Sequence, residues 1–253
     1  MGESPSRWGD LGRRALSALV LAPIALACLW IGGWPYQALI VAAGVGLAAE
    51  WAGLFGQGAW RAAGLAAAML AAAAATILGS AVVALALLVA GCAAVRSQSR
   101  PLLALGVLYV GLPMVALLWL RAQPGGREIT LFLVFVIWAS DIGAFLIGRL
   151  VRGPKLAPAL SPGKTWSGAV GGLVAVLLVA AAMTPHRYAL ALALGAICQA
   201  GDLLESGIKR HVGVKDSGRL IPGHGGLLDR LDGLLAAAPV AALVMLWSRG
   251  GFG

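Results

Sequence analysis

The chain has 253 residues, of which 60% are hydrophobic and only 11% are charged, and its formal net charge is +9. A soluble domain is typically about half apolar and about a quarter charged, and a soluble protein of this length needs far more polar side chains to cover its surface. The composition therefore excludes a soluble enzyme, a disordered chain and a disulfide scaffold, and it indicates a polytopic membrane protein.

Nine apolar stretches have the character of membrane-spanning helices, for which a bilayer core requires about 20 residues each. In chain order they cover residues 15–33, 35–55, 60–78, 79–95, 101–120, 129–150, 166–184, 187–205 and 228–248. We therefore predict an all-α, polytopic integral membrane protein with about nine transmembrane helices. About five spans lie in an N-terminal part, residues 1–128, and the others lie in a C-terminal part, residues 129–253, which holds most of the polar motifs.

The basic residues set the expected orientation of this bundle. With the N-terminus in the cytosol, 15 of the 19 Lys and Arg residues fall on the cytosolic side and 4 on the far side, in agreement with the positive-inside rule. An odd number of spans leaves the C-terminus on the far side. The loops 150–165 and 206–228 then both face the cytosol, and the excess positive charge requires no nucleic-acid partner. The richness in Ala, Gly and Arg favours a bacterial inner membrane.

Acidic side chains gather in the second half of the chain, inside or beside predicted spans. They are Asp141, Asp202, Glu205, Asp216, Asp229 and Asp232. A carboxylate within a membrane helix costs roughly 2.5–3.5 kcal/mol on insertion scales and usually has a function. Residues three apart share one face of a helix. Asp202 with Glu205, and Asp229 with Asp232, therefore form two pairs that can meet at the same depth on the cytosolic side.

Two explanations of this cluster remain open. Clustered carboxylates repel one another unless a cation lies among them, and oxygen ligands favour Mg²⁺. Alternatively, Arg210, Arg219 and Arg230 neutralise them in a salt-bridged loop, and a neighbouring Arg pairs with Asp141 only to hold the bundle together.

The loop 206–228 combines basic residues with glycines. The basic residues are Lys209, Arg210, Lys215 and Arg219, and the glycines are Gly213, Gly218, Gly223, Gly225 and Gly226. Glycine lets the backbone approach a ligand closely, and basic side chains bind phosphate. The composition indicates a phosphate site, while a plain interfacial loop against anionic lipid is the alternative.

A second basic loop ends in Gly163-Lys164-Thr165, which imitates the end of a P-loop. The complete motif requires a glycine five positions before Gly163, and that residue is a proline. We therefore reject a P-loop but retain Lys164 and Thr165 as phosphate contacts. Gly168 and Gly172, four residues apart, are expected to allow close helix packing.

The motifs of the second half form one long pattern. It consists of Asp141-x-Gly143-Ala144-Phe145, then Ser161-Pro162-x-Lys164-Thr165-Trp166, then Gln199-Ala200-Gly201-Asp202-Leu203-x-Glu205-Ser206-x-x-Lys209-Arg210, then Lys215-Asp216-x-Gly218, and finally Pro222-Gly223-His224-Gly225-Gly226-x-x-Asp229-Arg230-x-Asp232. Over roughly residues 130–235, this pattern resembles the phosphatidate cytidylyltransferase (CDP-diacylglycerol synthase) family. Members of that family usually carry a basic residue where this chain has Gly163 and an acidic one where it has Ser167.

The resemblance implies an enzyme of phospholipid biosynthesis that converts CTP and phosphatidate into CDP-diacylglycerol and pyrophosphate, with Mg²⁺ as cofactor and K⁺ as a companion ion. Asp202 and Asp229 correspond to metal ligands of the family, and Glu205 and Asp232 are further candidates. The implied catalytic residues are Asp202, Asp229, Lys209, Arg210, Lys215 and Asp216. The implied substrate-binding residues are Asp141, Ser161, Lys164, Thr165, Ser206, Arg219, Gly223, His224, Gly225, Gly226 and Arg230. A homodimer is compatible with the resemblance.

Two other classes of protein remain as alternatives. A CTP-dependent lipid kinase of the polyprenol or phytol type would transfer the γ-phosphoryl group to an alcohol and would need a general base beside that hydroxyl. An ion-coupled transporter would use the buried carboxylates and should contain inverted repeats, of which the sequence gives no sign.

Overall fold

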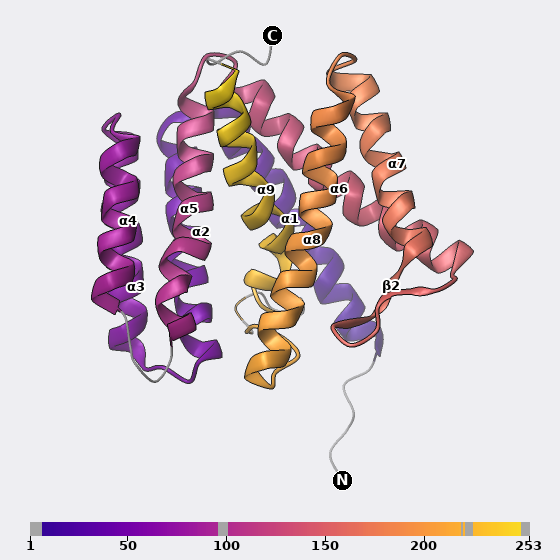
Figure 1. Ribbon diagram of the computed structural model, residues 1–253, viewed down its shortest axis with the longest axis horizontal. Helices are drawn as coiled ribbons and strands as arrows, with labels where there is room; N and C mark the ends of the chain where they lie inside the picture. Colours follow the sequence, from indigo (N-terminus) through magenta and orange to yellow (C-terminus); the bar gives the residue numbers. More distant parts are fainter. Residues whose placement is uncertain (1–6, 96–100, 219, 221–224, 249–253) are drawn as a thin grey trace.

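The computed structural model of the protein describes residues 7–95, 101–218, 220 and 225–248, with side chains described for residues 19–95, 102–218, 220 and 225–248. Within these residues the chain forms nine α-helices and one two-stranded hairpin (Figure 1). In chain order they are α1 (Arg7–Ile31), α2 (Gly33–Leu54), α3 (Ala59–Ile77), α4 (Ala81–Val95), α5 (Pro101–Ala122), α6 (Gly126–Val151), β1 (Lys155–Ala157), β2 (Ser161–Thr165), α7 (Trp166–Met183), α8 (Tyr188–Val212) and α9 (Leu228–Trp247).

Seven helices in the described ranges are long and apolar enough to cross a membrane: α2, α3, α5 from Leu102, α6, α7, α8 and α9. The apolar part of α1, Leu19–Ile31, is shorter. Helix α4 has 15 residues, which corresponds to a length of about 22 Å against a bilayer core of about 30 Å. The helical, polytopic architecture is thus confirmed, whereas the count of nine spans stays a prediction.

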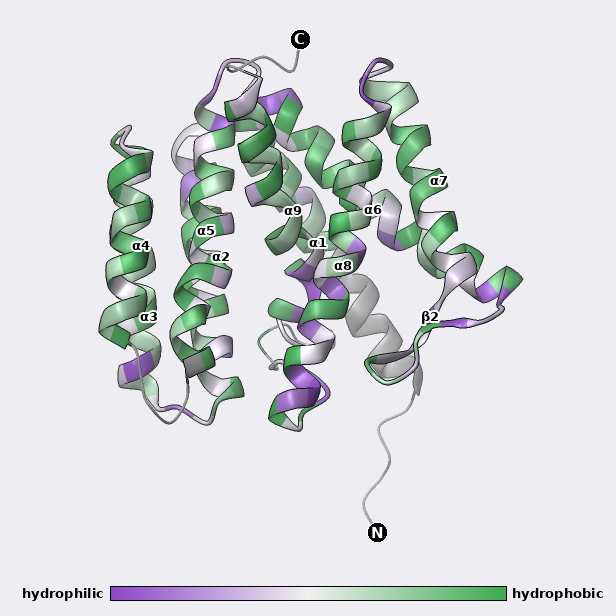
Figure 2. Ribbon diagram, in the orientation of Figure 1, coloured by the Kyte–Doolittle hydropathy of each residue, from purple (hydrophilic) through white to green (hydrophobic). Residues whose placement is uncertain are grey.

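The outer faces of the bundle are apolar. Figure 2 shows hydrophobic residues along the helices and a concentration of hydrophilic residues at the lower end of α8 and beside α9. Val82, Leu178 and Leu243 are exposed large side chains on three different helices. A soluble monomer rarely leaves extended apolar surface of this kind in water, so these faces suit contact with lipid chains.

Helices α6 and α7 pack closely because glycines lie between them. A Cβ atom on Gly143 of α6 would lie 2.6 Å from the Cβ of Ala175, and one on Gly168 of α7 would lie 2.8 Å from the backbone oxygen of Ala144. A Cβ on Gly172 would lie 2.7 Å from another backbone oxygen of α6. The expected role of Gly168 and Gly172 in helix packing is confirmed.

The segment between α6 and α7 is a β-hairpin rather than the predicted loop. Strand β1 pairs antiparallel with β2, and Lys155 lies opposite Thr165. Thr165 then caps α7, because its Oγ1 accepts a hydrogen bond of 3.1 Å from the backbone N–H of Gly168. Within the described residues this hairpin is a local addition to an architecture that remains all-α. Its strands lack the alternation of polar and apolar residues that predicts a half-buried strand.

Helix α8 is longer than predicted. The predicted span ends at residue 205, but α8 continues to Val212 and is terminated by Gly213, whose φ of 82° is left-handed. Ile208 and Val212 pack against the core, and the helix dipole favours basic residues such as Lys209 in the last turn. The predicted loop 206–228 therefore begins only at residue 213, and Lys209 has a fixed helical position.

The connections between helices gather at two ends of the bundle. In Figure 1, α1 begins at the end that carries the hairpin and the α8–α9 connection, and α9 finishes at the opposite end. The two polar segments that we expect on one side of the membrane therefore lie at one end of the bundle. Which side of the membrane this end faces stays a prediction.

Candidate active site

A polar cavity of about 740 Å³ opens between the hairpin and helices α6, α7, α8 and α9. Its charged lining residues are Asp141, Arg149, Lys164, Asp202, Lys209, Asp229, Arg230 and Asp232. Four carboxylates and four basic side chains from four elements thus line one space. All of them except Arg149 were predicted as site residues, so the fold brings together groups that lie up to 91 positions apart in the chain.

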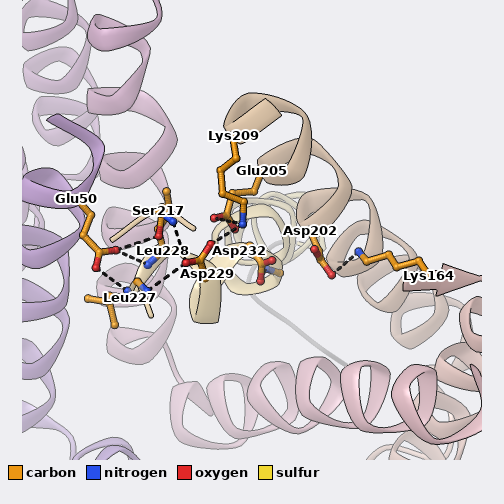
Figure 3. Close-up of polar contacts among 12 residues, drawn as sticks. Glu50, Lys164, Asp202, Glu205, Lys209, Ser217, Leu227, Leu228, Asp229 and Asp232 are labelled. Atoms are coloured by element: carbon orange, nitrogen blue, oxygen red, sulfur yellow. Dashed lines mark hydrogen bonds and ion pairs between the residues drawn. The ribbon is translucent and has the colours of Figure 1, made fainter. Parts of the chain in front are cut away.

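Lys164 of β2 forms an ion pair with Asp202 of α8 inside this cavity (Figure 3). The two side chains are 25% and 36% exposed, so water screens the pair and it holds each partner only weakly. Ser161 and Thr165 of the same strand also line the cavity. Strand β2 therefore directs a lysine to a carboxylate in a pair that can be separated by a phosphate, which would bind the lysine, or by a metal ion, which would bind the carboxylate.

Asp229, in the first turn of α9, is held more firmly. Its Oδ1 lies 2.5 Å from the Nζ of Lys209, and its Oδ2 accepts hydrogen bonds from the backbone N–H groups of Ser217, at 3.0 Å, and Gly226, at 3.2 Å (Figure 3). Hydrogen bonds to an ionised group are shorter and stronger than neutral ones. The orientation of the Asp229 carboxylate is therefore set by α8 and by the loop that precedes α9.

Glu205 is fully buried, and it is not among the described residues that line the cavity. The Nζ of Lys209, one turn further along α8, lies 3.2 Å from its Oε1. Within the described residues, neither carboxylate oxygen has a hydrogen bond of good geometry. Lys209 thus joins Glu205 to Asp229, so one member of each acidic pair contacts the same lysine.

Asp232 and Asp141 complete the carboxylate set. Figure 3 shows Asp232 between Asp229 and Asp202, and its Oδ1 accepts a hydrogen bond of 2.8 Å from the backbone N–H of Gly233. Asp141 faces the cavity from α6. Carboxylates from three helices, α6, α8 and α9, therefore line the cavity together with its basic side chains.

The donor chemistry of the cavity fits a magnesium ion bound together with phosphates. In the part of the chain that the structure describes, no three Asp, Glu, His or Cys side chains come close enough to enclose a metal ion by themselves. Mg²⁺ in phosphate-transferring sites usually takes one or two carboxylates, with water and substrate phosphates as its other ligands. Asp202, Asp229 and Asp232 offer such hard oxygen atoms in one cavity, whereas Glu205 lies outside it.

Other predicted residues lie around the cavity or outside the described residues. Ser206 and Arg210 are on α8, and Lys215 and Asp216 follow it; none of the four is among the described lining residues. Arg219, Gly223 and His224 lie outside the described residues. Gly225 has a left-handed φ of 85°. Gly226 is so close to Ser217 that a Cβ atom would lie 1.9 Å from the hydroxyl oxygen.

Besides Arg149, two further polar residues at this end of the bundle, Gln199 and Glu50, were not predicted. Gln199 lines the cavity, and its Nε2 donates hydrogen bonds to the Ser140 hydroxyl, at 3.3 Å, and to the Ala169 carbonyl, at 3.1 Å. Glu50 of α2 is 6% exposed and contacts the loop that holds Asp229. A sequence signal for Glu50 exists, since it is the only acidic residue between positions 11 and 127 and lies within a predicted span.

An apolar groove of about 680 Å³ adjoins the polar cavity. Helices α1, α2, α5, α6 and α9 line it, mainly with Leu, Ile, Val and Ala side chains. Asp141 and Arg230 line both spaces, so the polar cavity and the groove meet between α6 and α9. A ligand with a phosphate group and hydrocarbon chains could occupy both at once.

The helical bundle thus offers a charged cavity and an apolar groove that share Asp141 and Arg230. The chain belongs to the cytidylyltransferase family, whose profile matches residues 12–248. A phosphatidate cytidylyltransferase from Brucella suis biovar 1 is 41% identical over 92% of this chain and 93% of its own length. Proteins of the same name from Staphylococcus saprophyticus and Staphylococcus aureus strain COL are 40% and 38% identical over 56% and 57% of this chain, and over 57% and 58% of their own lengths.

Proposed function

We propose that the chain is a phosphatidate cytidylyltransferase, a membrane enzyme that converts CTP and phosphatidate into CDP-diacylglycerol and pyrophosphate. Its family indicates the group transferred, and a relative that bears this name matches 92% of the chain. The structural observation that carries the proposal is the meeting of a polar cavity and an apolar groove at Asp141 and Arg230. A lipid phosphate requires both environments, so phospholipid synthesis fits better than a reaction of soluble substrates alone.

The reaction brings two polyanions together, so its barrier is largely electrostatic. A phosphatidate oxygen attacks the α-phosphorus of CTP, and the bond from that phosphorus to the β-phosphate breaks as pyrophosphate leaves. Lys164, Lys209 and Arg230 line the cavity and can offset the charge of the phosphates. No general base is required, because a phosphate monoester has a second pKa of about 6 and is largely dianionic at neutral pH.

Mg²⁺ is the cofactor that we assign to this reaction, and Asp202, Asp229 and Asp232 would hold it. When bound, Mg²⁺ neutralises phosphate oxygens and helps to align the reacting groups. Lys164, which pairs with Asp202, would then be free to bind a phosphate of either substrate. Lys209 would continue to orient Asp229 from α8.

We place the enzyme in the bacterial cell membrane with its cavity open to the cytosol, where CTP is present. The similar proteins named above come from bacteria, and the positive-inside rule puts the basic segments beside the cavity on the cytosolic side. The resemblance is also compatible with a homodimer, which sedimentation of the purified protein in detergent would test.

A product assay with purified protein tests the proposal. Labelled CTP, phosphatidate and Mg²⁺ should give CDP-diacylglycerol and pyrophosphate in equal amounts, and chelation of Mg²⁺ should stop the reaction until the ion is restored. Formation of CDP and a phosphorylated lipid from a supplied lipid alcohol would instead identify a lipid kinase. Folded protein that converts no CTP under any of these conditions would favour a transporter.

A further inference from the structure

Helix α9 begins with a side-chain cap that comes from the other half of the chain. Its first N–H groups have no intrahelical partners, and its own N-cap residue, Leu227, makes no side-chain capping hydrogen bond. Glu50 of α2 supplies the acceptors instead. Its Oε1 accepts from the N–H of Leu227 and its Oε2 accepts from the N–H of Leu228, both at 2.8 Å (Figure 3). A carboxylate is the favoured group at this position, because the helix dipole is positive there.

The same carboxylate also holds the loop before α9. The Ser217 hydroxyl donates to the Oε2 of Glu50 at 3.4 Å, while the Ser217 N–H donates to the Oδ2 of Asp229 at 3.0 Å. These groups are closely packed, since a Cβ atom on Gly218 would lie 2.7 Å from the Oε1 of Glu50. Glu50 and Asp229 therefore both bind Ser217, one through its hydroxyl and the other through its backbone N–H.

Glu50 is itself held in place by its neighbour in the sequence. Trp51 is 1% exposed, and its Nε1 donates to the backbone carbonyls of Leu103, at 3.2 Å, and Leu102, at 3.3 Å. Its ring fills the position that a side chain on Gly106 would occupy, since a Cβ there would lie 2.1 Å from the indole. The end of α2 is thus anchored to α5, and this anchor gives Glu50 a defined place from which to hold α9.

We infer that Glu50 is a positioning residue for the cytidylyl-transfer reaction: it fixes Ser217 and the start of α9, and through them the orientation of the Asp229 carboxylate. It does not line the polar cavity among the described residues, so it acts through Asp229 rather than on the substrates. The inference rests on the role proposed for Asp229. It also gives the N-terminal helices a specific task in the chemistry of the C-terminal part.

Substitution of Glu50 by Gln tests this inference with little change of shape. The amide retains one acceptor but presents an NH₂ group to the other backbone N–H, so one capping hydrogen bond is lost. We expect kcat per folded molecule to fall by about 10–100-fold, the usual effect of losing a group that orients a metal ligand, and the Mg²⁺ concentration for half-maximal rate to rise. Glu128→Gln, at the exposed start of α6, is the matched control and should leave both quantities unchanged.

Amide hydrogen exchange supplies a readout that is independent of activity and of the metal. In metal-free protein, Glu50→Gln should accelerate exchange in residues 213–218 and 225–228 while leaving α2 and α5 protected. Ser217→Ala removes the hydroxyl alone and should give a smaller change in the same direction. The double variant should be hardly worse than Glu50→Gln, because both changes disrupt one network. Ser217→Ala remains informative if Glu50→Gln does not fold.

Four results would overturn the inference. The first is unchanged exchange in residues 213–218 and 225–228 for both variants, and the second is faster exchange with an unchanged kcat and Mg²⁺ requirement. The third is a fully active Asp229→Asn protein measured in parallel, which would reject the role of Asp229 itself. A lower yield of folded Glu50→Gln protein with a normal kcat would assign Glu50 a role in folding only, which also contradicts the inference.

Discussion

At the scale of single residues, the carboxylates of the cavity differ in how firmly they are held. Asp229 is fixed by Lys209 and by two backbone N–H groups. Asp202 instead forms an ion pair with Lys164 that is partly exposed and screened by water. A rigid carboxylate beside an adaptable one suits a site that must accept both a nucleotide and a lipid phosphate, because one carboxylate stays in place while the other adjusts.

Replacement of Asp202 or Asp229 by Asn should abolish most activity. Asn keeps the shape but loses the charge that holds a hard divalent ion, and we expect a loss of at least about 100-fold in rate per folded molecule. If the two act as one unit, the double variant should be little worse than either single variant. CDP-diacylglycerol formation across a Mg²⁺ titration measures this. Near-normal rates with an unchanged Mg²⁺ optimum would show that these residues only form salt bridges.

Lys164 should matter far more than its neighbour Gly163. A charge-assisted hydrogen bond to phosphate contributes about 1.5–3 kcal/mol, so Lys164→Ala should lower kcat/KM by about tenfold or more. Gly163 is exposed, and a Cβ atom there meets nothing within 4 Å, so Gly163→Lys should be tolerated. Steady-state kinetics with CTP and with phosphatidate varied separately would measure kcat/KM for both variants. An inactive Gly163→Lys beside an active Lys164→Ala would contradict the proposed contact.

At the scale of elements, the close packing of α6 and α7 places Asp141 and strand β2 on opposite walls of one cavity. A Cβ on Gly143 would lie 2.6 Å from the Cβ of Ala175, so Gly143→Val should overpack this interface and cost about 1–3 kcal/mol of stability. Thermal unfolding in detergent should show a lower Tm. Gly53→Ala is the control, because a Cβ there meets nothing within 4 Å and alanine favours a helix. Equal Tm values for the two variants would disprove the packing role.

The ends of the elements were the part of the fold that sequence patterns predicted least well. The apolar stretches located the helices, and the separate helices α3 and α4 on either side of Gly79 follow the predicted boundary. The continuation of α8 through Lys209 and the hairpin at β2 were missed. The end of α8 and the hairpin are both polar segments at the membrane boundary. Hydropathy falls there although hydrogen-bonded structure continues, so a prediction based on hydropathy ends the element too early.

At the scale of the whole molecule, the orientation in the membrane follows from the distribution of charge. After replacement of Cys28, Cys92 and Cys198 by Ala, single cysteines at Ala159 in the hairpin turn and at His211 near the end of α8 should react with an impermeant thiol reagent only in permeabilised cells. A cysteine at Pro124, between α5 and α6 at the other end of the bundle (Figure 1), should react in intact cells. Strong labelling at position 159 or 211 from outside would reverse the proposed topology.

The sequence by itself determined the class of this protein, its helical membrane architecture and its family. Hydropathy is a local property that survives any packing, and the motif from Ser206 to Asp232 is contiguous enough to be read directly. The family and the activity inferred from these residues agree with the comparisons. The charged residues that line the cavity were also mostly foreseen, because charges within membrane spans are rare and conspicuous.

Only the tertiary structure decided what each charge contacts. Asp202 and Glu205 are three residues apart on one helix, yet one lines the cavity and the other is fully buried against Lys209. Glu50 lies 179 positions before Asp229 and still holds the loop that orients it. Spacing along a helix predicts a shared face but not which neighbour covers it. That neighbour is set by how distant helices pack, and so the partners of Asp229 became visible only in the folded bundle.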